Sequence, residues 1–540
     1  GRIKAADDNL FVDDPVSIMR LFRVAEHNNL AIHPATLRLV RRSRRSIGKQ
    51  MRADPAANKL FLDILTKSRD PEAVLRRMSE AGVLGRFIHE FGRITALMQF
   101  NMYHHYTVDE HLIRAVGILS KIEQGLLKQD HPLASGIIKG VVSRRVLYVA
   151  VLLHDIAKGR REDHSIAGAR VAKTLCPRLG LSKSETETVE WLVRHHLLMS
   201  ETAQMRDLSD YKTITDFAAI VQSPERLRLL LILTVVDIRA VGPGVWNGWK
   251  GQLLRTLYSE TEPHLSGGHT SISRLDRIEA AKMALTGALS DWDAADISAY
   301  LDRHYDAYWY TVDLEHQVMD AKLLARAGAA NETVAFDVRT DNFKSITEIT
   351  VYVPDHPRLL ALLTGACAAG GANIVGAKIF TTTDGMALDT LLIQRVFEDA
   401  DDEHRRIDRV LDLMRQAFAG KIQLRKAVAE ASRPKGRIKA FTVEPQVILS
   451  NDTSNRFTVV EVAGLDRLGL LFKLTDSLFR LNLDIASAQI TTFGERAVDV
   501  FYVTDLIGQK ITSQTRLQSI EETLLDVLET GRKQEIARAG

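Results

Sequence analysis

The sequence predicts a multidomain protein that is all-helical over residues 1–340 and α+β over residues 341–540. In the first part, apolar residues recur at helical spacing behind recognisable helix start signals. One of these helices leads directly into a histidine and an aspartate. In the second part, predicted strands and helices alternate in two related units.

Proline marks the helix starts in the first hundred residues. Pro15 precedes apolar residues at helical spacing, Pro34 opens a second helix, and Pro71 opens a third that stops at Gly82. Proline is favoured in the first turn of a helix and glycine just past its end. We therefore expect a helical linker over residues 1–100.

A dense basic cluster follows the second of these starts. Its members are Arg38, Arg41, Arg42, Arg44, Arg45, Lys49 and Arg52, with no acidic residue among them. Two interpretations are open: contact with nucleic acid, or a helix face that is solvated or docks on an acidic neighbour. The second is favoured, because no aromatic side chain that could stack on a base lies between the basic residues.

The most informative pair is His154 and Asp155, which end an apolar run over residues 146–153. Such a run is typical of a buried helix, and Gly159 is placed as its stop. A buried helix that ends in imidazole and carboxylate delivers two metal-binding side chains into a pocket. This donor pair suits Mn, Fe or Zn, and the carboxylate also suits Mg.

Two further ligands are predicted beside helices of their own. His111 falls in the first turns of a helix, because Thr107 and Glu110 form a capping-box pattern ahead of its apolar residues. Asp237 ends a second apolar helix over residues 229–236.

Three more histidines lie between these ligands in the sequence. His164 follows Asp155 closely, and the pair His195 and His196 ends a predicted helix. The start of that helix is marked by Ser182 and Ser184, each of which has Glu three residues later.

The order His, His-Asp, Asp resembles the HD phosphohydrolase superfamily. The resemblance implies that one metal is held by His111, His154, Asp155 and Asp237, and that His164, His195 and His196 are additional ligands of two-metal members. It implies catalytic roles for Asp155, Lys158 and His164, with Lys158 placed to neutralise a phosphate. One metal could generate hydroxide and a second could clamp the phosphoryl oxygens; both arrangements stay open.

Composition agrees with a cytoplasmic enzyme. The chain has only Cys176 and Cys367, which predicts a reducing compartment without a disulfide framework. No apolar stretch reaches membrane-spanning length, so no membrane partner is expected. The net charge of +3, from 71 basic and 68 acidic residues, does not favour a general nucleic-acid partner. The chain opens on Gly1 without a signal peptide, and we expect a processed or truncated start.

The last third contains an internal repeat. Residues 327–342 are predicted as a loop, after which strand, helix, strand, hairpin, strand, helix and strand follow twice, a βαββαβ order. Asp355 and Asn373 recur as Asp466 and Asp484, both at an offset of 111. Asp389 recurs as Asp499 at an offset of 110, which places a one-residue length change in the hairpin turn.

This order resembles the ACT domain, a small module whose family role is to bind amino acids. The resemblance implies a glutamine site built from Asp355, Arg358, Asn373, Ile374, Asp466, Arg467, Gly469, Asp484 and Ile485. A helix start offers unpaired N–H groups to a carboxylate. A side-chain oxygen, of Asn373 or Asp484, would take the amino group. The alternative is a degenerate ACT pair that only dimerises.

The whole arrangement resembles the bifunctional uridylyltransferase/uridylyl-removing enzymes that modify the PII nitrogen-signalling protein. Residues 106–111, 153–159 and 494–503 carry the resemblance. It implies a helical linker over 1–100, an HD domain over 101–245, a helical connector over 246–340, and ACT domains over 341–450 and 451–540. Family members begin with a nucleotidyltransferase domain. Asp291 and Asp293 only superficially match its metal pair and are expected in a loop, so transferase activity is not expected from this chain.

The implied reaction is removal of UMP from a tyrosine of uridylylated PII, with metal-bound hydroxide as the attacking group and glutamine as the stimulating effector. A guanosine polyphosphate hydrolase is the enzymatic alternative, although those proteins carry a synthetase-like region and a single ACT domain. A catalytically silent glutamine sensor that binds PII is the other alternative. Alarmone turnover and metal content would discriminate between them.

Overall fold

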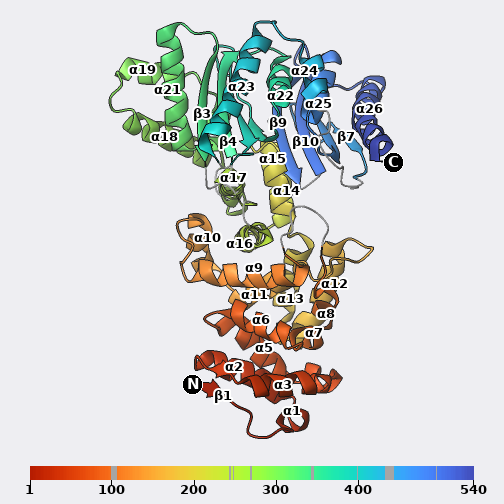
Figure 1. Cartoon of the computed structure of the whole chain (residues 1–540). Coiled ribbons are helices and arrows are strands. Elements are labelled where there is room, and N and C mark those ends of the chain that lie inside the picture. The colour runs from red at the N-terminus through yellow and green to blue at the C-terminus, as the bar shows by residue number, and fades with distance from the viewer. Residues whose placement is uncertain are drawn as a thin grey trace. The chain divides into compact units, whose positions relative to one another are not determined.

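The structure is a computed structural model that describes residues 1–98, 106–242, 245–246, 248–267, 270–341, 346–397, 399–431, 443–493 and 496–539 (Figure 1). It contains two compact units, one of residues 1–200 and 221–247, the other of residues 201–220 and 248–540. Among the described helices, none combines the length and the apolar character that crossing a membrane requires.

The first unit is almost entirely helical. Its helices are α1 (Leu10–Asp13), α2 (Val16–His27), α3 (Pro34–Ser43), α4 (Lys49–Ala53), α5 (Pro55–Lys67), α6 (Pro71–Glu80), α7 (Leu84–Phe87), α8 (His89–Ile94), α9 (Val108–Glu123), α10 (Pro132–Ile137), α11 (Arg144–Leu153), α12 (His164–Arg178), α13 (Lys183–Arg194) and α16 (Pro224–Val241). Two 3-10 turns, η1 (Arg44–Ser46) and η2 (Ile138–Gly140), and a short parallel pair, β1 (Arg2–Ile3) with β2 (Ala31–Ile32), complete it.

Helices start at the three predicted prolines. Pro34 and Pro71 lie in the first turn of a helix, as does Pro55, which was not predicted, whereas Pro15 is the cap residue just before α2. Asp54 accepts hydrogen bonds from the amides of two residues in α5, and Asp70 caps α6 in the same way. These caps satisfy amide groups that have no partner within the helix.

The capping box predicted at Thr107 does not form, although α9 does start where expected. The Thr107 side chain makes no cap hydrogen bond. Glu110 forms an ion pair with Arg76 of α6 instead, so a tertiary partner displaces the local one. The capping box at Ser182 and Glu185 is confirmed at the start of α13.

Helix α11 is the centre of the first unit. Every residue from Val146 to Leu153 is buried, and α9, α13 and α16 pack against it. A helix that is apolar on all sides must be surrounded by other helices. Its last turn therefore opens into the protein interior, where His154 and Asp155 follow.

The second unit contains helices and two sheets. The helices are α14 (Leu198–Met205, which begins in the first unit), α15 (Tyr211–Val221, which ends in the first unit), α17 (Gly248–Leu265), α18 (Thr270–Ala288), α19 (Ala294–Leu301), α20 (Asp306–Thr311), α21 (Leu314–Ala330), α22 (Leu359–Ala369), α23 (Ala400–Phe418), α24 (Leu424–Ala431), α25 (Leu470–Arg480) and α26 (Gln514–Ala539). Asp291 and Asp293 lie in the loop between α18 and α19, as predicted.

Both sheets are antiparallel and four-stranded. The first has the order β3-β4-β6-β5, from β3 (Ala335–Asp341), β4 (Ile346–Pro354), β5 (Ile374–Lys378) and β6 (Met386–Gln394). The second has the order β7-β8-β10-β9, from β7 (Gln446–Ser450), β8 (Thr458–Leu465), β9 (Leu483–Phe493) and β10 (Arg496–Asp505). The turn predicted at Gly494 lies outside the described residues.

The connectivity differs from the predicted βαββαβ order. Each repeat reads ββαββα, because the edge strand beside the first predicted strand precedes it in the sequence. Residues 335–341, predicted as part of a loop, form β3 and pair with β4 in full register. Two antiparallel strands can be joined by a short connection. Residues 335–341, which directly precede β4, can therefore pair with it and form the edge of the sheet.

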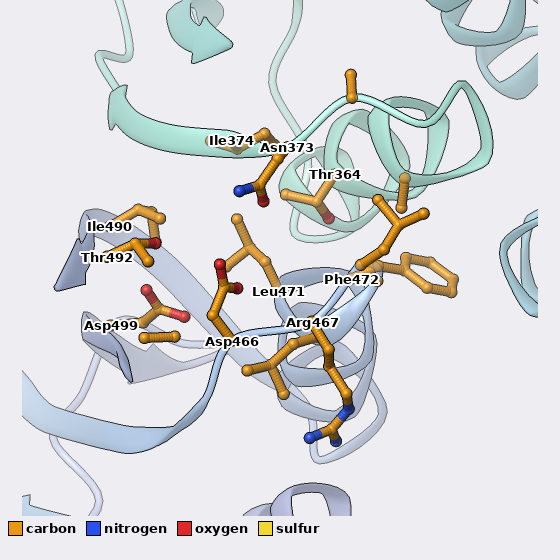
Figure 2. Close-up of a pocket in the computed structure, with 16 residues that line it drawn as sticks. Thr364, Asn373, Ile374, Asp466, Arg467, Leu471, Phe472, Ile490, Thr492 and Asp499 are labelled. Carbon is orange, nitrogen blue, oxygen red and sulfur yellow. The ribbon is translucent and has the colours of Figure 1, made fainter. Parts of the chain in front are cut away.

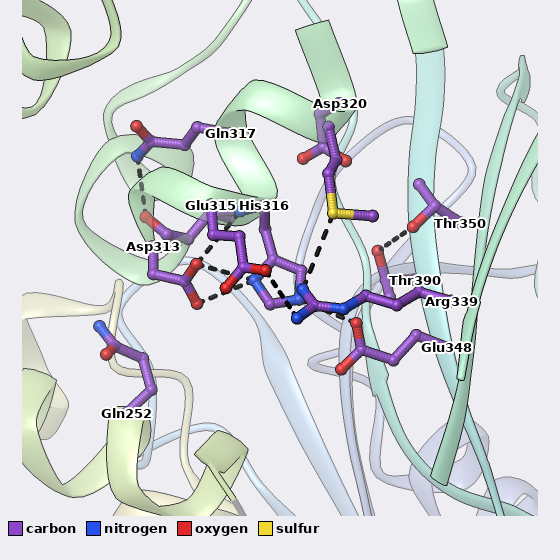
Figure 3. A network of polar contacts seen from close by, with 12 residues as sticks. Gln252, Asp313, Glu315, His316, Gln317, Asp320, Arg339, Glu348, Thr350 and Thr390 are labelled. Atoms are coloured by element: carbon purple, nitrogen blue, oxygen red, sulfur yellow. Dashed lines mark hydrogen bonds and ion pairs between the residues drawn. The ribbon is translucent and has the colours of Figure 1, made fainter. Parts of the chain in front are cut away.

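Helices cover both faces of each sheet. Helices α22 to α26 share one apolar core with the two sheets (Figure 1). The opposite face of the first sheet packs against α18, α20 and α21, and the opposite face of the second contacts Met205 of α14. Figure 3 shows a polar network between α21 and the first sheet, in which His316 lies 2.8 Å from both Asp313 and Glu348.

Candidate metal centre

Four metal-binding side chains from three helical segments converge at the end of α11. The Nε2 atoms of His111 and His154 lie 3.1 Å apart. Asp237 Oδ1 lies 3.2 Å from the first of these nitrogens and 3.3 Å from the second. Ligand atoms that surround one ion at about 2.1 Å are separated by about 3 Å, so these spacings fit a shared cation.

A second group shares Asp155 with the first. Asp155 Oδ2 lies 3.6 Å from the Nε2 atoms of His111 and His154. Asp155 Oδ1 lies 3.5 Å from His164 Nε2 and 3.6 Å from His196 Nε2. The two oxygens of one carboxylate thus face two groups, each of which could hold a metal ion. Both groups therefore share Asp155.

The structure does not bring His195 into either group. Its ring lies against Trp191, with centroids 5.0 Å apart, whereas the neighbouring His196 is buried beside Asp155. Successive residues at a helix end point in different directions, so one histidine of the pair faces the centre.

Backbone carbonyls orient two of the imidazoles. His154 Nδ1 lies 2.8 Å from the Val151 carbonyl, and His196 Nδ1 lies 2.8 Å from that of Val193. When Nδ1 donates to the carbonyl, Nε2 keeps its lone pair, which then points into the centre.

The electrostatics favour ionised carboxylates. Burial opposes ionisation of Asp155, but the Lys158 ammonium, at 2.5 Å, and His154 lower its pKa well below the usual range. Asp237 shows the same balance. Burial by itself would raise its pKa, but His154 and His111 outweigh burial and bring the pKa well below the usual range. The pKa of His154 is raised, because the two carboxylates outweigh its burial. Burial lowers the pKa of His164, which keeps that imidazole neutral.

Orphaned polar atoms show that these residues fit a cation. Asp155 Oδ1 and His164 Nε2 are buried and have no hydrogen-bond partner within the part of the chain that the structure describes. Such groups are costly unless something coordinates them. Nitrogen and carboxylate donors suit Mn, Fe and Zn, with Mg accepted by the carboxylates.

A second candidate site lies between the two repeats. Figure 2 shows a small cavity of about 30 Å³ between α22 with β5 and the loop that starts α25. Five of the nine predicted glutamine-site residues line it: Asn373, Ile374, Asp466, Arg467 and Gly469. The others, Asp355, Arg358, Asp484 and Ile485, lie outside its lining. Gly469 adopts a positive φ of 83°, which a glycine accepts without strain.

Sequence reasoning missed Asp499 as a residue of this cavity. Asp499 lines it together with Asp466, and burial and Asp466 raise the pKa of Asp499 to about 8. Burial also raises the pKa of Asp466, although the Asn373 side chain opposes the shift. The signal was present in the sequence, because Asp499 interrupts an otherwise apolar strand.

The equivalent position in the first repeat carries one more carboxyl group. Asp389, the counterpart of Asp499, is buried on β6, and burial and Asp355 raise its pKa well above the usual range. Burial and Asp355 also raise the pKa of Asp484. Asp484 stands where the other copy has Asn373, so the two sites are not equivalent.

Three family profiles match separate parts of the chain. Family profiles described as "Uridylyltransferase GlnD third domain", "HD domain" and "ACR family N-terminal ACT domain" match residues 1–87, 108–228 and 453–530. Among solved structures, CCA-adding enzymes in complex with CTP and with ATP align at 14% identity over 62% and 60% of this chain and 63% of theirs. Their TM-scores of 0.33 and 0.32 are too low to indicate a shared fold.

A curated relative matches nearly the whole chain. It is the bifunctional uridylyltransferase/uridylyl-removing enzyme of Nitrobacter winogradskyi, 53% identical over 533 residues, which make up 98% of this chain. The chain spans 57% of that relative's length. This identity over nearly the whole chain, together with the matches to the third-domain, HD and ACT profiles, shows that the chain belongs to the family of bifunctional uridylyltransferase/uridylyl-removing enzymes.

Proposed function

We propose that this chain is a metal-dependent phosphodiester hydrolase that removes UMP from a tyrosine of uridylylated PII protein. The observation that carries the proposal is Asp155, whose two carboxylate oxygens face two separate ligand groups. The name of the Nitrobacter relative supports the uridylyl-removing reaction. A full-length family member would also attach UMP from UTP, a reaction not expected of this chain.

The residues of the centre have distinct roles in this proposal. His111, His154, Asp155 and Asp237 would hold one divalent cation, Mn or Mg, or alternatively Fe or Zn, and Asp155, His164 and His196 would hold a second. The bound metal would supply the Lewis acidity that activates water and stabilises charge on the phosphoryl oxygens. Lys158, next to Asp155, would offset further negative charge as the bond to phosphorus breaks.

The leaving group makes a modest demand on the protein. The phenol of tyrosine has an ordinary pKa near ~10, so it leaves more readily than an alkoxide. Where only one metal is bound, His164 would instead be the proton acceptor at the edge of the centre, because it is 26% exposed and burial lowers its pKa.

Glutamine is proposed as the effector, bound at the cavity of Asp466 and Asp499. The cavity of about 30 Å³ has room only for the ammonium end of the ligand, which Asp466 and the buried Asp499 would bind, and Asn373 adds an amide. The start of α25 offers backbone N–H groups to the ligand's carboxylate. Coupling to hydrolysis of about 1–3 kcal/mol is expected for an effector of this kind.

A segment near the candidate metal ligands in sequence would carry that coupling. Residues 201–220 begin shortly after His196 and pack on the second sheet. Arg206 forms an ion pair with Glu461 at 2.5 Å, and the Asp207 amide donates to the Tyr502 hydroxyl at 2.7 Å. A conformational change in the second sheet would therefore be transmitted to residues 201–220, which lie in sequence between two candidate ligands, His196 and Asp237.

The test is to incubate the chain with uridylylated PII and Mn²⁺, with and without glutamine, and to follow UMP release. Glutamine-stimulated release is expected. Release without stimulation would retain the hydrolase and reject glutamine control in this chain. Absence of release from a metal-loaded chain would reject the proposed substrate, and guanosine tetraphosphate turnover would then favour the alarmone hydrolase. A chain that binds glutamine and PII but no metal would be a sensor.

A cytoplasmic location is also proposed, consistent with the two buried free cysteines.

A further inference from the structure

A basic groove lies in the first unit, outside the ligand groups described above. It has a volume of about 520 Å³ and is formed by α4, α8, α12 and the loop before α12. Its basic side chains are Lys49, Arg52, Arg93, Arg160, Arg170 and Arg178. Glu90 is the single carboxylate in the described lining. The groove therefore has a strong excess of positive charge.

Little of this charge is neutralised by the protein. Within the described parts of the chain, Lys49 and Arg93 have no ion-pair partner, whereas Arg160 and Arg170 share Glu162. Six basic side chains with two carboxylates, Glu90 and Glu162, among them keep an excess of positive charge that favours an anionic ligand.

Arg178 is the most deeply placed of these cations. One terminal nitrogen donates to the Phe87 carbonyl at 3.1 Å, while Nε is buried and has no hydrogen-bond partner among the described residues. Burial lowers the pKa of Arg178 and the Arg52 guanidinium lowers it further, although Glu90 opposes both. A guanidinium held in this way has donors to spare for a carboxylate.

The groove follows α12 away from the candidate metal centre. His164 is the first residue of α12, and Ala167, Arg170, Thr174 and Arg178 of the same helix line the groove. This spacing of three and four residues keeps them on one side of the helix. At 1.5 Å per residue, Arg170 lies about 9 Å along the axis from His164. The nearest lining residue of α12, Ala167, lies three residues from His164, so the groove starts within one helical turn of the centre.

We propose that this groove binds an extended acidic segment of the protein that carries the scissile phosphodiester. This rests on the proposed function, because it names how the macromolecular substrate is held beside the HD centre. The five guanidinium groups come from α4, α8, α12 and the loop before α12, and they line a groove of about 520 Å³ rather than surround one point. This distribution suits successive carboxylates better than a single phosphate. Among the described lining residues only His89 has a ring, so a platform for stacked bases is lacking.

Direct binding tests the groove without relying on catalysis. The probe is a fluorescein-labelled peptide of eight glutamates, titrated with the intact chain at low and at physiological salt and followed by anisotropy. Arg93→Gln/Arg170→Gln is expected to weaken binding about tenfold. The matched control, Arg41→Gln/Arg42→Gln, removes the same charge from exposed positions on α3 outside the groove and is expected to change binding less than twofold.

Equal binding by the groove variant and the parent would overturn the proposal. A single-stranded oligonucleotide that binds more tightly than the peptide, and loses binding in the groove variant, would also overturn it in favour of nucleic acid. Circular dichroism and the melting temperature establish that both variants fold.

Kinetics separate this proposal from the proposed function. The ratio of the KM for uridylylated PII to the KM for the small diester bis(4-nitrophenyl) phosphate is expected to rise about tenfold in the groove variant. An unchanged ratio would count against the groove. If the metal-loaded parent hydrolyses neither substrate, the proposed function fails, while the peptide titration still decides whether the groove binds acidic segments.

Discussion

The hydroxyl oxygens of Thr364 and Thr475 lie 3.0 Å apart where α22 meets α25. The two residues are separated by the same 111 positions as Asp355 and Asp466. A contact between equivalent residues of two copies is the signature of a local two-fold axis. The tandem repeats therefore pair as a symmetric dimer would, and each candidate ligand position occurs twice around this axis.

The two copies are expected to differ in glutamine binding. Asp499→Asn removes a carboxylate from the cavity beside Asn373 and should weaken glutamine binding at least tenfold. The matched control is Asp389→Asn, the same change at the counterpart position outside the cavity lining, and it should leave the affinity within about threefold. Isothermal titration calorimetry measures both. A larger loss of affinity in Asp389→Asn than in Asp499→Asn would show that glutamine binds at the first repeat instead.

Glutamine affinity is expected to rise with pH from about 6 to about 8. The pKa of Asp499 is about 8 in the free protein because of burial and Asp466, so at lower pH its carboxyl is mostly protonated. An ammonium group favours the carboxylate, and binding must then release a proton. The affinity gain is at most tenfold per pH unit. Titrations in two buffers of different ionisation enthalpy would reveal the released proton, and an identical heat in both would contradict the prediction.

Asp155→Asn is expected to abolish UMP release, by about 10³-fold or more, and to lower bound Mn²⁺. The substitution removes the carboxylate that both ligand groups share and leaves two sets of histidines without it. Elemental analysis after dialysis measures the metal. His195→Gln, one position from the ligand His196, is the control and should retain metal and activity, because its ring packs on Trp191. Loss of metal in the His195→Gln variant would show that His195 is a metal ligand after all.

Arg206→Ala is expected to reduce the stimulation of UMP release by glutamine several-fold while glutamine still binds. The change breaks the ion pair with Glu461, one of the contacts that hold residues 201–220 on the second sheet. Lys212→Ala is the control, since among the residues that the structure describes Lys212 forms an ion pair only with Asp216 of its own helix, at 2.8 Å. Equal stimulation in both variants would exclude this contact as the coupling route.

The stability contributed by His316 is expected to disappear at alkaline pH. Hydrogen bonds to Asp313 and Glu348 raise its pKa to about 9, against burial, from about 6.5 in the unfolded chain. The raised value means that the stabilisation is complete below pH 6.5 and is lost as pH rises through 9. Its size is about 1–3 kcal/mol. The difference in melting temperature between the parent and His316→Gln should therefore be large at pH 6.5 and small at pH 10.

Much of the fold could be predicted because local chemistry specifies it. Proline starts, the Ser182 capping box and apolar periodicity located helices of the first unit, and the offset of 111 located the repeat. The short pair β1 and β2 was missed, and so were β3 and β7, which are edge strands of the two four-stranded sheets. An edge strand has one neighbour and short local signals, so its place depends on the partner strand rather than on its own residues.

For the candidate sites, the donor types could be predicted from the sequence, because His111, His154, Asp155 and Asp237 each lie in or directly after an apolar helix that must be buried. How these side chains meet depends on the packing of distant segments. This packing directs the two oxygens of Asp155 to different histidine groups, selects His196 over His195, and places Asp499 in the cavity between the repeats. Side-chain direction and pairing across distant segments depend on packing, which no local pattern encodes.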